Sequence, residues 1–126
     1  MTKLRELYQC EICGNVVEVV YEGAPALVCC GKPMVKLEAK TEDEGEEKHV
    51  PVVEETDKGI KVKIGSIEHP MEEEHYIKFI EVLTEKEIMR VELRPGEAPE
   101  AKYCTPKSDV LEVREFCNIH GLWKNK

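Results

Sequence analysis

The sequence is poor in aromatic residues, in basic charge and in long apolar runs. Phe, Trp and Tyr make up 6% of its 126 residues although hydrophobic residues reach 41%, so its core must consist mostly of Val, Ile and Leu. Lysine and arginine number 18 against 26 acidic residues. The resulting net charge of −8 argues against a nucleic-acid-binding surface and for a soluble protein.

Segments that direct a chain to or through a membrane are also missing. Residues 1–7 contain no apolar stretch of the kind found in a signal peptide. No run approaches the ~20 apolar residues of a transmembrane helix, so we expect no membrane association. These absences predict a cytoplasmic protein. Disulfides are rare in that compartment, so the six cysteines indicate metal or redox chemistry.

Histidine is scarce and unevenly placed. The four histidines all follow residue 48, whereas four of the six cysteines precede residue 31. The potential metal ligands therefore fall into an N-terminal group of thiols and a C-terminal group that is mostly imidazole. This division predicts two metal sites on two domains.

Turn residues and an acidic segment divide the chain into three parts. We expect a small domain over residues 1–38, an acidic linker over 39–48 and a second domain over 49–126. The first part alternates short β-rich runs with turns. Domains below ~40 residues usually need disulfides, metals or oligomerisation, and a metal held by the N-terminal cysteines would meet that need.

Alternation of apolar and polar residues dominates the second domain. Ile60, Val62 and Ile64 alternate with lysines, which predicts a half-buried strand, and strands are also expected near 50–53, 89–93 and 110–116. Residues 71–83 could form an amphipathic helix, or a loop followed by a strand from Tyr76, and their β-branched content favours the loop and strand. The sequence therefore predicts an all-β fold with an antiparallel sandwich or barrel.

The N-terminal cysteines could surround one metal ion. Cys10 and Cys13 form a C-x-x-C pair, and Cys29 and Cys30 are adjacent. Four thiolates in a tetrahedron suit iron or zinc, and the spacing does not separate the two metals. The adjacent pair needs a tighter backbone than the second C-x-x-C pair of an ordinary zinc ribbon. A disulfide between neighbouring cysteines would be strained and is not expected.

A second set of candidate ligands combines the histidines with a late cysteine. It consists of His49, His69, His75, Cys117 and His120. Cys117 and His120 lie three residues apart in a C-N-I-H-G turn, so both can reach one ion. Zinc in proteins is mostly four-coordinate, whereas five ligands leave one position open on an octahedral metal such as iron. Blue copper fits poorly, because it needs only two histidines and usually a weak axial Met, and no Met follows Cys117.

Taken together, these motifs resemble desulfoferrodoxin, the two-iron form of superoxide reductase. The resemblance spans the chain through C-x-x-C with C-C, E-K-H-V-P at 47–51, H-P-M-E-E-x-H-Y at 69–76 and C-N-I-H-G-x-W at 117–123. It implies a desulforedoxin-like N-terminal module with an Fe(Cys)₄ centre. It also implies an immunoglobulin-like β-sandwich domain that carries the active iron, and a homodimer.

The resemblance also implies roles for single residues. The four histidines would be equatorial ligands of the active iron, and Cys117 would be its axial ligand. Glu47 is similar to the carboxylate that binds the oxidised iron in the resting state, and Lys48 to the cation near the open position. The implied reaction is one-electron reduction of superoxide to hydrogen peroxide, with a rubredoxin-type protein as electron donor.

Two other functions are compatible with the residues alone, an electron carrier and a structural metal-binding module. The metals of both are normally closed to further ligands, so an open position, with Glu47 and Lys48 beside it, favours an enzyme. Cys104 belongs to neither ligand set. We expect it to be a small buried hydrophobic residue, with a reactive thiol as the alternative.

Overall fold

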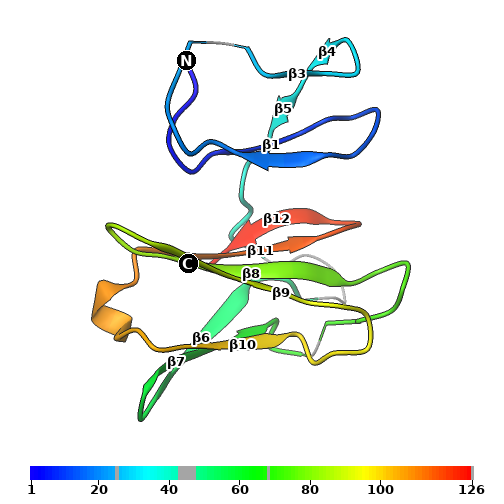
Figure 1. The fold of residues 1–126 in the computed structure, drawn as a ribbon. Coiled ribbons are helices and arrows are strands. Elements are labelled where there is room, and N and C mark those ends of the chain that lie inside the picture. Colours follow the sequence, from blue (N-terminus) through cyan, green and yellow to red (C-terminus); the bar gives the residue numbers. More distant parts are fainter. Residues whose placement is uncertain (25, 43–47, 68, 126) are drawn as a thin grey trace. The chain divides into compact units, whose positions relative to one another are not determined.

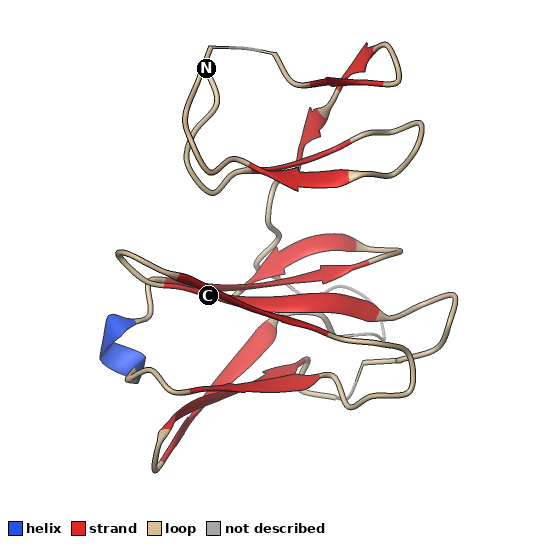
Figure 2. Ribbon diagram, viewed as in Figure 1, coloured by secondary structure: helices blue, strands red, loops and turns tan. Residues whose placement is uncertain are grey.

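The structure, a computed structural model, describes residues 1–24, 26–42, 48–67 and 69–125. These residues form short β-strands joined by turns, together with one 3₁₀-helix, η1 (Lys107–Asp109) (Figure 2). The chain divides into two units, Met1–Glu38 and Ala39–Lys126. The prediction of an all-β fold is confirmed. No helix in the described part of the chain has the length and apolar character needed to cross a membrane.

The N-terminal unit contains a small sheet and a separate hairpin (Figure 1). The sheet has the order β2-β1-β5, formed by β1 (Leu7–Gln9), β2 (Val16–Glu18) and β5 (Val35–Lys36), and the hairpin pairs β3 (Val28–Cys29) with β4 (Lys32–Pro33). Among the described residues of this unit, the buried hydrophobic side chains are Leu7, Cys10 and Val19. Such a core is too small to hold the unit together without a cross-link.

The C-terminal unit is an antiparallel β-sandwich. Its sheets have the orders β10-β7-β6 and β12-β11-β8-β9, and they face each other as two layers in Figure 1. The strands are β6 (Pro51–Thr56), β7 (Gly59–Ile64), β8 (Ile77–Leu83), β9 (Ile88–Glu92), β10 (Glu100–Tyr103), β11 (Glu112–Cys117) and β12 (Gly121–Lys124). Strands β10 and β12 were not predicted from the sequence, because each is only four residues long and lacks a clear apolar alternation.

The core of the sandwich lies between these two sheets. Alternate residues of β7, Ile60, Val62 and Ile64, point into it, as their spacing predicts, and each is at most 1% exposed. Burial of such a side chain is worth about 1.5–3 kcal/mol. Strand β8 begins at Ile77 after a turn segment, which confirms the loop followed by a strand for residues 71–83.

The beginning of the predicted linker is attached to the sandwich. Lys40 forms a parallel β-bridge with Trp123. Its N–H donates to the carbonyl of Leu122 at 3.0 Å, and its own carbonyl accepts from the N–H of Lys124 at 2.9 Å. The backbone of Lys40 is therefore paired with β12, although the residue is exposed to solvent. Residues 43–47 of the predicted linker lie outside the described residues.

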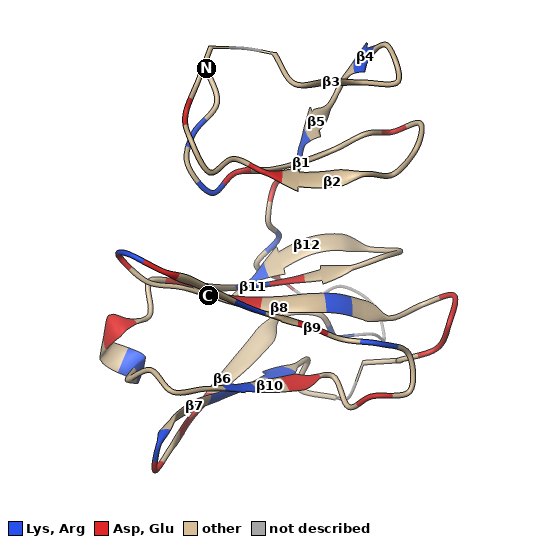
Figure 3. Cartoon of the chain, viewed as in Figure 1, with Lys and Arg blue, Asp and Glu red and all other residues tan. Residues whose placement is uncertain are grey.

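A carboxylate shared by two arginines ties three strands of the larger sheet together. Glu81 on β8 is fully buried, and its two oxygens accept from the Nε atoms of Arg90 on β9 and Arg114 on β11, each at 2.8 Å. Other charged residues of both signs are spread along the strands and turns of each unit (Figure 3). Their exposed pairs, such as Lys63 with Glu54, contribute little to stability.

We predict that Glu81→Gln lowers the free energy of unfolding of the sandwich by about 3–5 kcal/mol, because two guanidinium groups lose the carboxylate that they share. Urea unfolding followed by the fluorescence of Trp123, the only tryptophan, measures this unit alone. The matched control Glu54→Gln breaks an exposed pair and should cost at most about 1 kcal/mol. Equal effects of the two variants would contradict the prediction.

Candidate metal centres

The cysteines of the N-terminal unit converge on one point. The Sγ atoms of Cys10, Cys13, Cys29 and Cys30 all lie within 4.8 Å of one another. Sulfur atoms around a tetrahedral ion with metal–sulfur bonds of about 2.3 Å are about 3.8 Å apart, so this spacing fits one ion. The structure thus brings together the four cysteines that the sequence singled out.

Two tight turns place these thiols. In the turn after β1, the N–H of Cys13 donates to Cys10 Sγ at 3.4 Å. In the β3–β4 hairpin, the two central residues are Cys30 and Gly31, with φ of 54° and 71°. Two consecutive positive φ values are typical of a type I′ turn. This turn leaves the Sγ atoms of the adjacent cysteines only 4.0 Å apart, so both can bind the same ion.

Ionisation is uneven among three thiols of this cluster, because the pKa of Cys10 is lowered and the pKa values of Cys29 and Cys30 are raised. The backbone N–H of Cys13 lowers the pKa of Cys10 to about 6. The neighbouring thiols of Cys13 and Cys10 raise the pKa of Cys30 to about 12, and they also raise the pKa of Cys29. A divalent or trivalent metal would reverse this repulsion, because metal coordination deprotonates thiols. The cluster is therefore built for a metal rather than for free thiols.

The second cluster lies at one end of the sandwich. His49 precedes β6, His69 and His75 lie between β7 and β8, Cys117 ends β11, and His120 lies in the β11–β12 turn. Antiparallel pairing brings these chain segments together: Pro51 at the start of β6 pairs with Ile64 at the end of β7. On the other sheet, Cys117 pairs with the first residues of both β8 and β12.

The four imidazoles form a closed ring of neighbours. Ring-centroid distances are 4.5 Å for His49–His69, 4.9 Å for His69–His75, 5.0 Å for His75–His120 and 4.8 Å for His120–His49. Donor atoms of three of these histidines and of Cys117 lie within 4.8 Å of one another, and His75 is outside that set of four. Nitrogens on opposite sides of an ion are about 4.2 Å apart, so these donors fit a single metal.

The five candidate ligands of the second cluster differ in solvent exposure, and the thiol is the most deeply buried of them. Cys117 is completely buried, and His49 and His69 are 3% and 2% exposed. His75 is half-buried and His120 is exposed. The cluster therefore has a dry side at the thiol and a side that small molecules can approach from solvent.

Groups around His49 and His69 orient their rings. The Nδ1 atom of His49 lies 3.7 Å from the carboxylate of Glu115, which is fully buried on β11. Trp123 stacks on the same imidazole at 4.6 Å with an angle of 14° between the rings. The Nδ1–H of His69 donates to the carbonyl of Pro70 at 2.7 Å, so its Nε2 carries the lone pair for a metal. Such partners fix the tautomer and direction of metal-binding histidines.

The pairing of β8 with β11 is irregular next to Cys117. Phe116 pairs with Phe79 but Cys117 pairs with Ile77, so β8 contains one extra residue at this step. Bulges of this kind redirect side chains next to active sites. Here the bulge separates the regular sheet from the turn that presents Cys117 and His120.

Of the two residues predicted to act beside the metal, only Lys48 is described. Lys48 is half-buried, and its backbone packs against Gly65, which has φ of 81°. A methyl group at residue 65 would overlap the carbonyl of Lys48, so the glycine allows the Lys48–His49 segment to approach β7. Glu47 lies outside the described residues.

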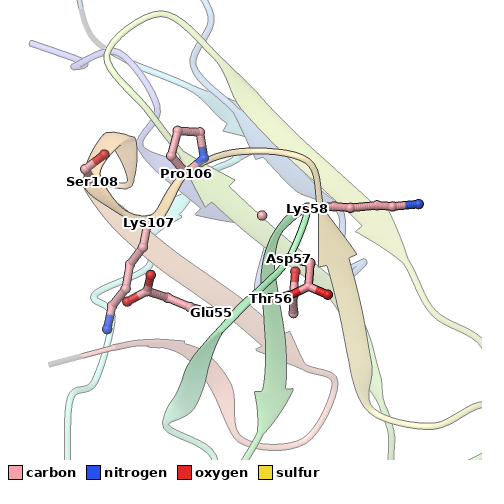
Figure 4. Close-up of a pocket in the computed structure, with 8 residues that line it drawn as sticks. Glu55, Thr56, Asp57, Lys58, Pro106, Lys107 and Ser108 are labelled. Atoms are coloured by element: carbon pink, nitrogen blue, oxygen red, sulfur yellow. The ribbon is translucent and has the colours of Figure 1, made fainter.

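Cys104 corrects one sequence-based expectation. It is exposed, not buried, because it follows the end of β10 on the outside of the sandwich. A surface hollow of about 630 Å³ lies nearby, between the β6–β7 turn and η1 (Figure 4). The side chains of Lys58 and Lys107, which line this hollow, extend in different directions (Figure 4). The two lysines therefore do not converge on a common ligand. It is at the far end of β6 from His49, about 20 Å away by the length of the strand.

A β-sandwich that gathers four imidazoles and a thiolate, joined to a module with four thiols, defines a protein with two mononuclear metal centres. Residues 41–126 match the desulfoferrodoxin family, and residues 2–37 match the N-terminal domain of desulfoferrodoxin. The chain belongs to the desulfoferrodoxin family. The resemblance inferred from the sequence motifs is thereby confirmed.

Relatives match over almost the whole chain. A desulfoferrodoxin from Syntrophotalea carbinolica is 52% identical and covers 100% of this chain and 99% of its own, and a desulfoferrodoxin homolog from Archaeoglobus fulgidus is 51% identical over 99% of both. The crystal structure of the superoxide reductase from Treponema pallidum has a TM-score of 0.79 and 33% identity, and covers 96% of this chain and 97% of its own. The two ligand clusters agree with the two iron centres of this family.

We predict that Cys13→Ser removes the metal of the N-terminal unit and leaves the iron of the sandwich in place. Without the metal cross-link, amide hydrogen exchange within residues 1–38 should increase greatly, because the apolar core of that unit is too small to hold it folded. Metal analysis and hydrogen exchange measure both effects. Cys104→Ser, at an exposed cysteine outside both clusters, is the control that should keep two irons. Loss of both irons from the Cys13 variant would contradict independent centres.

Glu115→Gln tests the carboxylate beside His49. The substitution keeps the size of the side chain and removes a negative charge that stabilises the more positive, ferric state, so we predict a higher midpoint potential for the sandwich iron. Iron affinity should fall roughly 10–100-fold, as for other partners of metal-binding histidines. Redox titration and chelator competition measure the two quantities. Glu112→Gln, on the same strand but paired with Lys124, should change neither, and a wild-type potential in Glu115→Gln would refute this role.

Proposed function

We propose that this chain is a superoxide reductase, which converts superoxide to hydrogen peroxide at the centre formed by His49, His69, His75, Cys117 and His120. The observation that carries the proposal is this set of five donors in a member of the desulfoferrodoxin family. Structural zinc sites take four ligands, whereas five protein donors leave one position of an octahedral ion for a small substrate. An electron carrier or a structural module would have no use for that position.

Bound iron would supply the single electron that, with two protons, turns superoxide into hydrogen peroxide. The thiolate of Cys117 is fully buried at the end of β11, where no water competes for its charge. Bound to the metal, this thiolate would push electron density toward it, so Cys117 would favour loss of that electron. The four imidazoles hold the ion in the sandwich, and the exposure of His120 marks the side from which a small anion arrives.

Lys48 draws the substrate to the centre. Superoxide is an anion, and the net charge of −8 repels it from most of the surface. A local positive group must overcome that field, and Lys48 is the lysine directly before the ligand His49. We also assign to Lys48 the ordering of the water that delivers protons to the product.

Glu47 completes the proposed site. Its place in the E-K-H-V-P motif, immediately before Lys48, supports its assignment as the carboxylate that binds the oxidised iron in the resting state. A carboxylate in that role would be a ligand for the oxidised iron between turnovers. Its position is not among the described residues.

An external rubredoxin-type protein returns the electron, in the cytoplasm. The family resemblance supports this donor, and the exposed His120 offers it a ligand at the protein surface. We propose residues 1–38 as the desulforedoxin-like iron domain, residues 39–48 as the connection and residues 49–126 as the catalytic domain. Whether the Fe(Cys)₄ centre relays electrons or only stabilises its domain is decided by the activity of the Cys13→Ser variant.

The proposed reaction is tested by rapid mixing of the reduced protein with superoxide. We expect the sandwich iron to be oxidised with formation of one hydrogen peroxide per iron and without release of dioxygen. Dioxygen release would indicate dismutation instead. Unchanged sandwich iron would leave only an electron carrier or a structural module.

We predict that Lys48→Ile slows the bimolecular reaction with superoxide by roughly tenfold or more, because the local attraction for the anion is lost. The rate should also lose much of its dependence on salt, since screening acts on that same attraction. Stopped-flow rates at increasing ionic strength measure both. Lys58→Ile removes a lysine at the far end of β6 and should react like the wild type. A wild-type rate for Lys48→Ile would remove Lys48 from the mechanism.

A homodimer is also proposed, formed through the N-terminal unit. This small unit leaves large apolar side chains exposed, including Val20 at 77%, Tyr21 at 89% and Val28 at 60%. These side chains line one apolar groove. Exposed apolar patches of this kind mark association surfaces, and a second copy would supply the apolar area that the unit lacks.

We therefore predict that the wild-type protein sediments as a dimer and that Tyr21→Glu shifts it toward monomer by placing a charge in the apolar groove. Analytical ultracentrifugation measures the change. Leu111→Glu, at an apolar residue of the sandwich that is 69% exposed, is the control and should remain dimeric. A monomeric wild type would exclude the proposal.

A further inference from the structure

Asn118 joins the two loops that carry His75 and the Cys117–His120 pair. Its side-chain Oδ1 accepts from the N–H of Tyr76 at 2.9 Å, and its Nδ2 donates to the carbonyl of Glu74, also at 2.9 Å. Its own backbone N–H donates to the carbonyl of Tyr76 at 3.2 Å. The residue directly after Cys117 therefore binds the backbone on both sides of His75.

His75 is the ligand that most needs such support. It is only half-buried, and it lies outside the group formed by His49, His69, Cys117 and His120. Its own loop forms one isolated bridge, between Glu72 and His75. The three preceding residues, 72–74, are all exposed glutamates, whose mutual repulsion favours opening of the loop.

The geometry points to Asn118 as a positioning residue, which holds His75 at the distance from Cys117 and His120 that a shared iron requires. The inference rests on the iron centre of the proposed function but not on its reaction with superoxide. The amide suits this task, because it offers one acceptor and one donor in a plane and both are used toward the His75 loop. A carboxylate would keep the first bond and lose the second.

The test measures the rate at which the sandwich iron is lost to a strong ferrous chelator, together with the electron paramagnetic resonance spectrum of the ferric form. We expect Asn118→Ala to lose iron roughly 10–100-fold faster than the wild type, the range for residues that orient metal ligands. Its spectrum should shift in the same direction as that of His75→Ala. The variant Asn118→Asp should fall between Asn118→Ala and the wild type.

A double-mutant cycle separates positioning from general destabilisation. If Asn118 acts through His75, the double variant Asn118→Ala with His75→Ala loses iron no faster than His75→Ala alone. The control Asn125→Ala removes a comparable bond, from the N–H of Val113 to Asn125 Oδ1 at 2.9 Å, and should retain iron like the wild type. The absorption of the Fe(Cys)₄ centre serves as an internal standard for intact protein.

The inference would be overturned if Asn118→Ala lost iron as slowly as the wild type. It would also be overturned if the rate increases of the two single variants multiplied in the double variant. If Asn118→Ala does not fold, the Asn118→Asp variant decides the question. An iron-loss rate and a spectrum like those of the wild type would overturn the inference. An intermediate rate of iron loss, with a spectral shift in the direction of His75→Ala, would support it. Because iron retention is measured without superoxide, a failure here is distinct from a failure of the proposed reaction. A protein that retains iron but does not reduce superoxide would refute only the latter.

Discussion

Convergence of four imidazoles and one thiol at one end of the sandwich is the constraint on which the rest of this unit depends. The donors come from separate segments of the chain, yet neighbouring imidazoles lie within 5.0 Å of each other. Antiparallel pairing satisfies this constraint, because it returns the chain to the same end of the sandwich after every second strand. The packed core of β7, β8 and β11 then holds that end together, so little chain entropy has to be lost when the metal binds.

The two units depend on metal to different degrees. The sandwich has a continuous core of Ile, Val and Leu, and its stability rests on that core. The N-terminal unit has a very small core and positions Cys30 in the left-handed region, which is unfavourable by about 1–2 kcal/mol for a residue other than glycine. Bonds from four thiolates to one ion offset both deficits. The fold of the first unit therefore depends on its metal, whereas the fold of the second depends mainly on its apolar core.

The cysteines and histidines that converge could be singled out from the sequence, but most of the residues that support them could not. Cys and His are informative because their chemistry is specific and their number small. Glu115 lies beside His49, and Asn118 binds the backbone next to His75. Both contacts join residues that are far apart in the sequence, so no local sequence pattern predicts them. A partial signal for Glu115 was present, since Arg114 and Glu115 are adjacent charges between Val113 and Phe116 in a strand that leads to Cys117. The exposure of Cys104 and the pairing of Lys40 with β12 likewise depend on where short strands end.

A high-resolution crystal structure of the iron-loaded, reduced protein tests the account most directly. We expect one ion bound by His49, His69, His75, His120 and Cys117, with no protein side chain in the position opposite the thiolate. A four-coordinate ion without His75, or a sixth protein ligand in the reduced state, would contradict the account. Either result would mean that the centre is closed to substrate or built for a different metal.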